Sequence, residues 1–82
     1  MDRELTYGEQ AVGLTFNPSK NPEVDKIKKL YAEIIDTHFD ARAKIESGTP
    51  GAGEAARLHS VAITEAQTAQ MWAVKAITWE QK

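Results

Sequence analysis

The stretch that decides the fold is LTFNPSKNPEVDKIKK, residues 14–29, which joins a turn to the start of a helix. Both Asn-Pro pairs disfavour helical geometry at their asparagine, because the proline ring crowds the preceding residue. Asn21 is placed to cap the next helix, and Pro22 suits its first position, where no backbone N–H is needed. Glu23 and Asp25 suit the positive end of the helix dipole. The sequence therefore predicts a rigid turn followed by a helix that begins at Pro22.

Downstream of this turn, apolar residues recur three and four apart and predict a helix over about residues 22–47. Gly48 is expected to end it, and GTPGAG, residues 48–53, would form a flexible connection. The predicted packing seam is heptad-like and is interrupted by one histidine: Val24, Ile27, Tyr31, Ile34, His38, Ala41 and Ile45.

A further helix is predicted over about residues 53–79 and is apolar on most sides. Between Leu58 and Trp79 its only full charges are Glu65 and Lys75. Such a helix is usually buried on most sides, which a two-helix hairpin alone does not achieve. We therefore expect neighbours from other copies of the chain. The predicted seam comprises Leu58, Ala62, Glu65, Ala69, Trp72, Ala76 and Trp79. Beside it lies a second strip of Val61, Met71 and Val74, with Ile63, Ile77 and Ala66 near it.

Upstream of the turn, Thr6 and Glu9 have capping-box spacing, which predicts a short helix from about Tyr7 that stops at Gly13. This helix is too short to be stable alone and must dock. The 82 residues form one domain at most. We predict a single all-α domain over residues 1–82: a short N-terminal helix, then a two-helix antiparallel hairpin, assembled as a homo-oligomer.

Composition argues against several classes of function. The net charge of −2 does not suit binding to duplex DNA, which favours a strongly basic face. No apolar run approaches the roughly 20 residues of a membrane span, and the N-terminus lacks a signal-peptide core, so we expect a cytoplasmic protein. With no cysteine, His38 and His59 are too few for a convincing zinc site. Phosphate-loop and metalloprotease motifs are absent from the sequence. We therefore expect no enzyme, cofactor or metal.

Two sets of residues are candidates for ligand binding, each with a plainer alternative. Phe16 could stack on a base, and Lys28, which borders the apolar seam, suits a partly buried phosphate better than Lys26 or Lys29. The alternative is an ordinary solvated lysine surface. The second set lies within the apolar last helix and serves either interhelical hydrogen bonds or a pocket on a symmetry axis: Thr64, Glu65, Gln67, Thr68, Gln70, Lys75 and Thr78.

Two segments, TFNPSKNPEVDKIKKLYAEIID (15–36) and ITEAQTAQMWAVKAITW (63–79), resemble a known family. It comprises small phage proteins that share a helical-hairpin domain with anti-CBASS and anti-Thoeris cyclic-oligonucleotide sponges. The resemblance spans about residues 6–80 and is most specific at residues 16–19, 27–28 and 71–76. It implies a homohexamer in the cytoplasm of an infected bacterium. Its ligands would be defence-system messengers such as cyclic GMP-AMP or cyclic triadenylate, bound without cleavage.

The same resemblance implies two kinds of binding site. In the cyclic dinucleotide site, Lys28 looks like the family's lysine early in the first long helix, and Asn17 and Ser19 would add hydrogen bonds. The stacking aromatic is Phe16 or Tyr7, and Phe16 is preferred because it is nearer the helix start. The cyclic trinucleotide site would use the matching residue types on the last helix, which are Arg57, Thr64, Thr68 and Lys75.

Shared fold does not guarantee shared binding, so other functions stay open. One is an oligomeric helical interaction module that binds a host protein. A weaker one is an enzyme that degrades such nucleotides, although the sequence offers no metal site or nucleophile for it.

Overall fold

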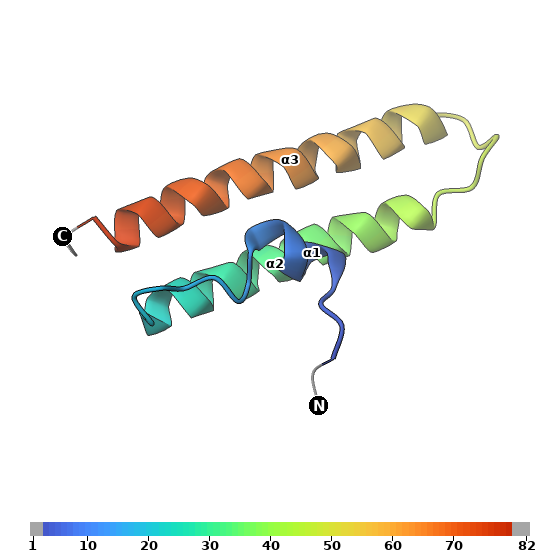
Figure 1. Cartoon of the computed structure of the whole chain (residues 1–82). Coiled ribbons are helices and arrows are strands. Elements are labelled where there is room, and N and C mark those ends of the chain that lie inside the picture. The colour runs from blue at the N-terminus through green and yellow to red at the C-terminus, as the bar shows by residue number, and fades with distance from the viewer. Residues whose placement is uncertain (1–2, 80–82) are drawn as a thin grey trace.

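The computed structural model describes residues 3–79, and over this range it contains three α-helices (Figure 1). They are α1 (Tyr7–Val12), α2 (Pro22–Ala43) and α3 (Ala52–Ile77). The two long helices run antiparallel as a hairpin, and α1 packs beside the middle of α2 (Figure 1). The predicted all-α architecture, a short helix followed by a hairpin, is confirmed.

The helix starts follow the predicted capping residues. Thr6 Oγ1 accepts a hydrogen bond from the Glu9 amide at 3.1 Å, and Glu9 Oε1 accepts one from the Thr6 amide at 2.9 Å. This reciprocal pair satisfies two amides that lack partners within the helix. Gly13 ends α1 with φ at 63°, where glycine carries no steric penalty. Asn21 Oδ1 accepts from the Glu23 amide at 2.8 Å and so caps α2 ahead of Pro22.

Asp36 of α2 fixes the N-terminal end of α1. Its Oδ1 accepts a hydrogen bond from the Gly8 amide at 2.7 Å, and its Oδ2 accepts one from the Thr6 hydroxyl at 2.7 Å. This approach requires glycine at position 8, since a Cβ there would lie 2.3 Å from the backbone oxygen of Ala32. The carboxylate also interacts favourably with the positive end of the helix dipole. A helix too short to be stable alone is thereby held by tertiary contacts.

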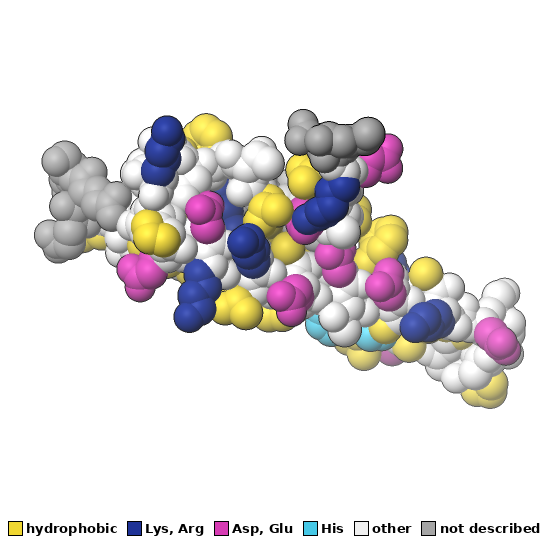
Figure 2. Space-filling model, turned by 90° about the horizontal axis from the view of Figure 1, so that it is seen from below, with side chains coloured by type: hydrophobic (Ala, Val, Ile, Leu, Met, Phe, Trp, Pro, Cys, Tyr) yellow, Lys and Arg dark blue, Asp and Glu magenta, His cyan; other side chains and the backbone are white. Residues whose placement is uncertain are grey.

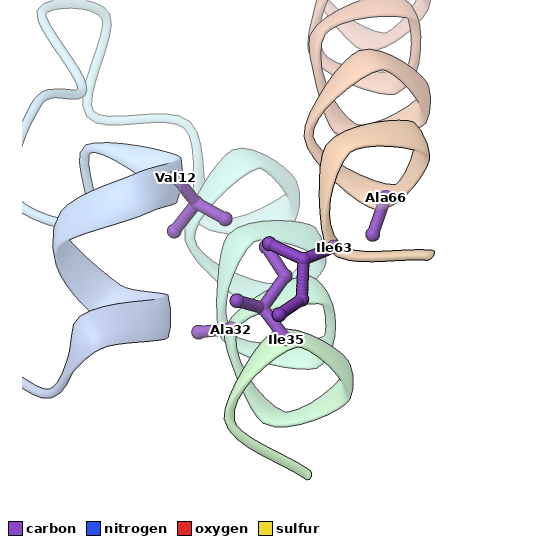
Figure 3. Packing of buried hydrophobic residues seen from close by; sticks show 5 residues of the cluster. All are labelled: Val12, Ala32, Ile35, Ile63 and Ala66. Atoms are coloured by element: carbon purple, nitrogen blue, oxygen red, sulfur yellow. The ribbon is translucent and has the colours of Figure 1, made fainter. Parts of the chain in front are cut away.

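The core is small and lies where all three helices meet. Ile35 is fully buried at its centre, and the side chains around it point toward one another (Figure 3). The Cα atoms span 51 × 32 × 12 Å, and the last dimension is too small for two stacked layers of helices, whose axes lie about 8–10 Å apart and whose Cα atoms extend about 2.3 Å beyond each axis. The helices therefore form a single layer, in which each helix is covered only along its edges. The buried cluster comprises Val12, Ala32, Ile35, Ile63 and Ala66.

Helix α2 ends earlier than predicted, at Ala43 instead of about Ser47. The Lys44 amide donates to the Ala41 carbonyl at 3.2 Å, and the Ile45 amide donates to the Arg42 carbonyl at 3.2 Å. These three-residue bonds tighten the last turn and take the place of further α-helical turns. Ile45, the last member of the predicted seam, therefore lies outside the helix.

The strips that pack within the chain overlap the predicted seams only in part, since Val24 is buried and Tyr31 packs against the core. In α2 the buried strip is Val24, Lys28, Ala32 and Ile35, and Ile34 of the predicted seam is 45 % exposed. In α3 it is Ile63, Ala66 and Gln70. Apolar residues surround most of α3, but a single layer covers only one strip of it. The large side chains left exposed on α3 are Leu58, Val61, Met71 and Trp72, and Trp79 is exposed just beyond its end.

No helix in the described part of the chain has both the length and the hydropathy to cross a membrane.

Candidate functional site

A pocket of about 290 Å³ lies where the Asn-Pro turn meets the start of α2 and the end of α3. Three segments that are distant in sequence contribute to it, because the antiparallel hairpin places the end of α3 beside the start of α2 (Figure 1). It brings together four of the residues predicted for the cyclic dinucleotide site: Phe16, Asn17, Ser19 and Lys28. The rest of the lining is Pro18, Val24, Val74 and Thr78.

Lys28 is the charged group of this pocket, and it is only 4 % exposed. Its Nζ donates to the carbonyl of Gly13 at 2.9 Å and to that of Phe16 at 2.5 Å. Burial lowers the pKa of the ammonium group, and the nearby carboxylate of Asp25 partly opposes this. An ammonium group has three N–H donors, so one is left for a ligand. Lys28 thus holds the turn onto α2 while it adds positive charge to the pocket wall.

Phe16 is the aromatic group of the pocket. Its side chain is 70 % exposed, and Lys28 Nζ lies 5.5 Å from its ring centroid, within the range of a cation–π contact. The Phe16 amide donates to the Gly13 carbonyl at 2.9 Å, so its backbone is fixed although its ring is not covered. An exposed ring on a fixed backbone is suited to stacking against a planar ligand group.

Asn17 lines the pocket, but the turn itself uses all the hydrogen-bonding capacity of its side chain. Its Nδ2 donates to the Asn21 carbonyl at 2.8 Å and to Asp25 Oδ1 at 3.0 Å. Its Oδ1 accepts from the Asn21 amide and from Ser19 Oγ, both at 3.3 Å. An amide side chain has two donors and two acceptor lone pairs, so none remains. Asn17 shapes the pocket, whereas Ser19 keeps acceptor lone pairs for a ligand.

Val74 and Thr78 complete the pocket from α3 and were not predicted as part of this site. Thr78 Oγ1 donates to the Val74 carbonyl at 2.8 Å, which leaves its oxygen able to accept a hydrogen bond. The sequence did mark Thr78 as a polar residue in an apolar helix. No local sequence pattern connects Thr78 to a turn about sixty residues earlier. Antiparallel pairing of the two long helices does imply that the end of the second lies near the turn before the first.

Tyr7, the alternative stacking residue, does not line this pocket. Its ring stacks on Phe39 of α2, with centroids 4.7 Å apart and an interplanar angle of 18°. The guanidinium carbon of Arg42 lies 5.3 Å from the centroid of the Phe39 ring. Tyr7 therefore contributes to the docking of α1 on α2.

The predicted trinucleotide residues form a line along the exposed side of α3. Arg57, Thr64, Thr68 and Lys75 are spaced by seven, four and seven residues, which places them on one face of a helix. All four are exposed, on the side away from the Ile63–Ala66–Gln70 strip. Arg57 and Lys75 are eighteen residues apart, or about 27 Å along the helix axis. One chain therefore does not bring these residues together around a small ligand.

Most of these side chains have neighbours on α3. Arg57 forms an exposed ion pair with Glu54 at 2.7 Å, which raises the pKa of Arg57 and lowers that of Glu54. Lys75 Nζ lies 5.4 Å from the Trp72 ring and 5.9 Å from that of Trp79. Both distances lie within the range of a cation–π contact, so the two rings attract the Lys75 ammonium group.

The remaining surface carries a shallow groove and mixed charge. The groove has a volume of about 560 Å³ and is lined by predicted seam residues and their neighbours: Ile27, Leu30, Tyr31, Glu33, Ile34, Thr37 and His38. On the face shown in Figure 2, lysine and arginine side chains alternate with acidic ones and with hydrophobic ones. This face has no continuous basic patch of the kind that binds a nucleic-acid polymer.

Comparison with known proteins identifies the domain. The family model for the hairpin domain of Acb2/Tad1 matches residues 8–78. This range contains α2, α3, the Asn-Pro turn and every predicted site residue except Tyr7. No curated protein and no solved structure matches the chain significantly.

Proposed function

The chain belongs to the Acb2/Tad1 hairpin-domain family of cyclic-nucleotide sponges, and we propose that it binds and sequesters cyclic di- and trinucleotides without cleaving them. The messengers would be those of bacterial defence systems, held in the cytoplasm of the infected host so that their effector stays inactive. The observation that carries this proposal is the pocket at the Asn-Pro turn, which gathers an exposed aromatic ring and a buried lysine.

The chemistry of this pocket suits a cyclic dinucleotide. A base stacks on the exposed face of Phe16, since every base has a π-face. A phosphate accepts a hydrogen bond from the remaining N–H of Lys28, and the attraction between the two charges is stronger where water has little access. Ser19 and Thr78 accept hydrogen bonds from the base or ribose. Phe16, Ser19 and Lys28 are held by hydrogen bonds within the turn, and Thr78 is held by its bond to Val74, so little order has to be gained on binding.

The pocket is small for a whole cyclic dinucleotide. Its 290 Å³ lies at the lower limit of small-molecule sites, which measure about 300–1,000 Å³. We propose that one chain accommodates one nucleotide half and that a second copy supplies the other wall. The exposed apolar residues of α3 and the groove on α2 provide surface for that association.

For a cyclic trinucleotide, the line on α3 is the proposed contact. Because it spans about 27 Å, α3 helices of several copies have to converge so that equivalent residues surround one ligand. A homohexamer provides this convergence through repeated interfaces. Lys75 then meets a phosphate, and Thr64 and Thr68 bond base edges.

Calorimetric titration of the purified chain tests the proposal. Cyclic GMP-AMP, other cyclic dinucleotides and cyclic triadenylate form the panel, with a linear dinucleotide as the control. We expect at least one cyclic ligand to bind with micromolar affinity or better, and to be recovered intact after heating. Absence of heat exchange with every cyclic ligand would reject the proposal, and recovery of cleaved ligand would indicate an enzyme.

Two variants separate the sites. Phe16→Ala removes an exposed ring and should weaken cyclic dinucleotide binding about tenfold or more, since base stacking contributes about 1–3 kcal/mol. Lys75→Ala should leave dinucleotide binding unchanged and weaken trinucleotide binding. If both variants bind both ligands as the unaltered chain does, the assigned pockets are wrong although the function stands.

An alternative function is a helical interaction module that binds a host protein. The observation in its favour is the exposed pair Met71 and Trp72 on α3, since such residues are common in protein interfaces. An inert nucleotide panel, together with a host protein that co-purifies with the chain but not with Trp72→Gln, would favour this function.

A further inference from the structure

The two histidines of the chain face each other across the hairpin, at the end opposite the pocket at the Asn-Pro turn. His38 lies on α2 and His59 on α3, and their Nδ1 atoms are 2.9 Å apart, the usual length of a hydrogen bond. The ring centroids are 5.2 Å apart, so both nitrogens lie close to the line between the centroids. Both side chains are half-buried, and Figure 2 shows histidine (cyan) at the surface. One hydrogen bond that protons from solvent can reach therefore joins the two long helices.

This bond requires that one Nδ1 carries a proton and that the other does not. In the neutral pair, the accepting ring carries its proton on Nε2, and the donating ring has a free Nε2. A first added proton binds to that free Nε2, and the resulting imidazolium still donates to its neighbour. A second added proton has only the accepting Nδ1 left to bind. The hydrogen bond is then lost, and two positively charged rings face each other.

Arg42 of α2 adds a positive charge beside the pair. It lies one turn beyond His38, and its Nη1 donates at 2.8 Å to the hydroxyl of the serine that follows His59. Among the residues three or four positions from either histidine, which share its side of the helix, Arg42 is the one charged residue. Arg57 and Glu54 of α3 are exposed and form an ion pair with each other. Because like charges repel, Arg42 opposes the second proton.

The other titratable groups around the pair are exposed or bound elsewhere. Glu33 and Tyr31 line the same groove on α2 as its histidine, but Glu33 is exposed, so water and salt screen its charge. The Asp36 carboxylate binds the N-terminal end of α1. From α1 itself, the Tyr7 ring stacks on α2 and Glu9 is held in an ion pair within the N-terminal segment. The charge that acts most directly on the histidine pair is therefore that of Arg42.

We propose that the His38–His59 pair is a proton-sensitive link between α2 and α3, which is closed with up to one added proton and is opened by the second. Histidine side chains change charge between about pH 5 and 8, so the link responds within that range. In the unfolded chain each ring binds a proton independently. The unfolded state therefore takes up more protons than the closed pair as the pH falls, and the stability of the hairpin decreases in that direction.

Thermal unfolding at pH 7 and at pH 5, at one low chain concentration, tests the link. The double variant His38→Asn/His59→Asn is the control, because it keeps every carboxylate that also titrates near pH 5. Between the two pH values, the melting temperature of the unaltered chain should fall about 4–8 °C more than that of the double variant, as expected for one lost hydrogen bond in a domain of this size. An equal or larger fall in the double variant would overturn the proposal.

NMR of the unaltered chain, with ¹⁵N-labelled imidazoles, gives a second measurement that does not depend on the folding of a variant. At pH 7 one Nδ1 should carry a proton and the other should not, whereas at pH 5 both should carry one and the contacts between the two rings should be lost. Two histidines that titrate independently, with their ring contacts unchanged, would contradict the proposal. Neither experiment depends on cyclic-nucleotide binding.

Discussion

At the Asn-Pro turn, Asn17 and Lys28 direct their polar groups to carbonyls, amides and a carboxylate of the same chain, whereas on α3 the side chains of Met71 and Trp72 are each 64 % exposed. We refer to residues 13–28 as the turn region. We use the name outer face of α3 for the exposed side chains of Leu58, Val61, Met71 and Trp72. The turn region is completed by contacts within one chain, so its geometry exists before any ligand arrives. The outer face of α3 is left exposed by the chain itself.

This difference follows from the thickness of the molecule. In a single layer of helices, polar groups at an edge find partners in the adjacent loop, but apolar groups on the flat sides find no neighbour in the same chain. Burying one large apolar side chain contributes about 1.5–3 kcal/mol of free energy. Covering the outer face of α3 in an assembly would therefore add stability that the single chain lacks. Changes in the two regions should therefore affect different measurements.

The largest expected loss of stability follows Gly8→Ala, which breaks the docking of α1 onto α2. The new Cβ would lie 2.3 Å from the backbone oxygen of Ala32 and 2.9 Å from the Asp36 carboxyl group. Because backbone moves little, we expect the free energy of unfolding to fall by about 3 kcal/mol. Urea denaturation measures it. Gly53→Ala is the matched control, since its Cβ meets no atom within 4 Å, and it should raise stability by about 0.5–1 kcal/mol. Equal effects of the two changes would contradict the docking geometry.

Lys28→Met comes next and breaks the turn region directly. It removes the Lys28 hydrogen bond from the Phe16 carbonyl and leaves the Gly13 carbonyl with the Phe16 amide alone, which should lower the free energy of unfolding by about 1–3 kcal/mol in urea denaturation. It should also abolish cyclic dinucleotide binding in calorimetry. The exposed neighbour Lys29 gives the control, since Lys29→Met should stay within about 0.5 kcal/mol of the unaltered chain. A stable Lys28→Met variant would mean that the turn holds itself.

Trp72→Gln should change the free energy of unfolding of the dilute chain less than Lys28→Met does, because the Trp72 ring is mostly exposed. Self-association should instead weaken roughly tenfold or more, given the apolar area that an interface would bury. Sedimentation over a range of chain concentrations measures this. Lys44→Gln, an exposed change beyond α2, serves as the control. If Trp72→Gln sediments like the unaltered chain, this face is not the interface.

The smallest expected effect is the dependence of the α1 cap on pH. Hydrogen bonds from Arg3 and Thr6 lower the pKa of Glu9 from its ordinary value of 4.5 to about 2. Folding therefore favours the ionised form of Glu9. The contribution of this carboxylate to the stability of the folded state is complete above about pH 4.5 and is lost as the pH falls through about 2. Amide hydrogen exchange in α1 should rise over that window. Glu9→Gln should remove this pH dependence, and an unchanged profile in that variant would assign it to another group.

The sequence predicted the helix starts well because their causes are local. The capping box at Thr6 and Glu9, the glycine at position 13 and the Asn21-Pro22 pair each act within a few residues. The packing faces were predicted poorly. A helix with apolar residues on most sides is compatible with several seams, and only the position of its neighbour selects Ile63 over Trp72 for burial.

The candidate site shows the same limit. Phe16, Asn17, Ser19 and Lys28 were predicted to belong together, and the structure places them around one pocket. No sequence pattern indicated that Lys28 would donate hydrogen bonds to carbonyls 12 and 15 residues upstream. Val74 and Thr78, and the meeting of His38 with His59, depend on how the two long helices pair, which no local pattern specifies.

The short connections of the chain carry a consequence for folding kinetics. Residues 13–21 join α1 to α2 and residues 44–51 join α2 to α3, so each helix packs against its neighbour in sequence. Helical proteins with such local contacts fold in microseconds to milliseconds. Synthesis adds only about 5–20 residues per second, so the hairpin has time to form as soon as α3 leaves the ribosome. The rate at which the proposed homo-oligomer forms should then be set by encounters between chains.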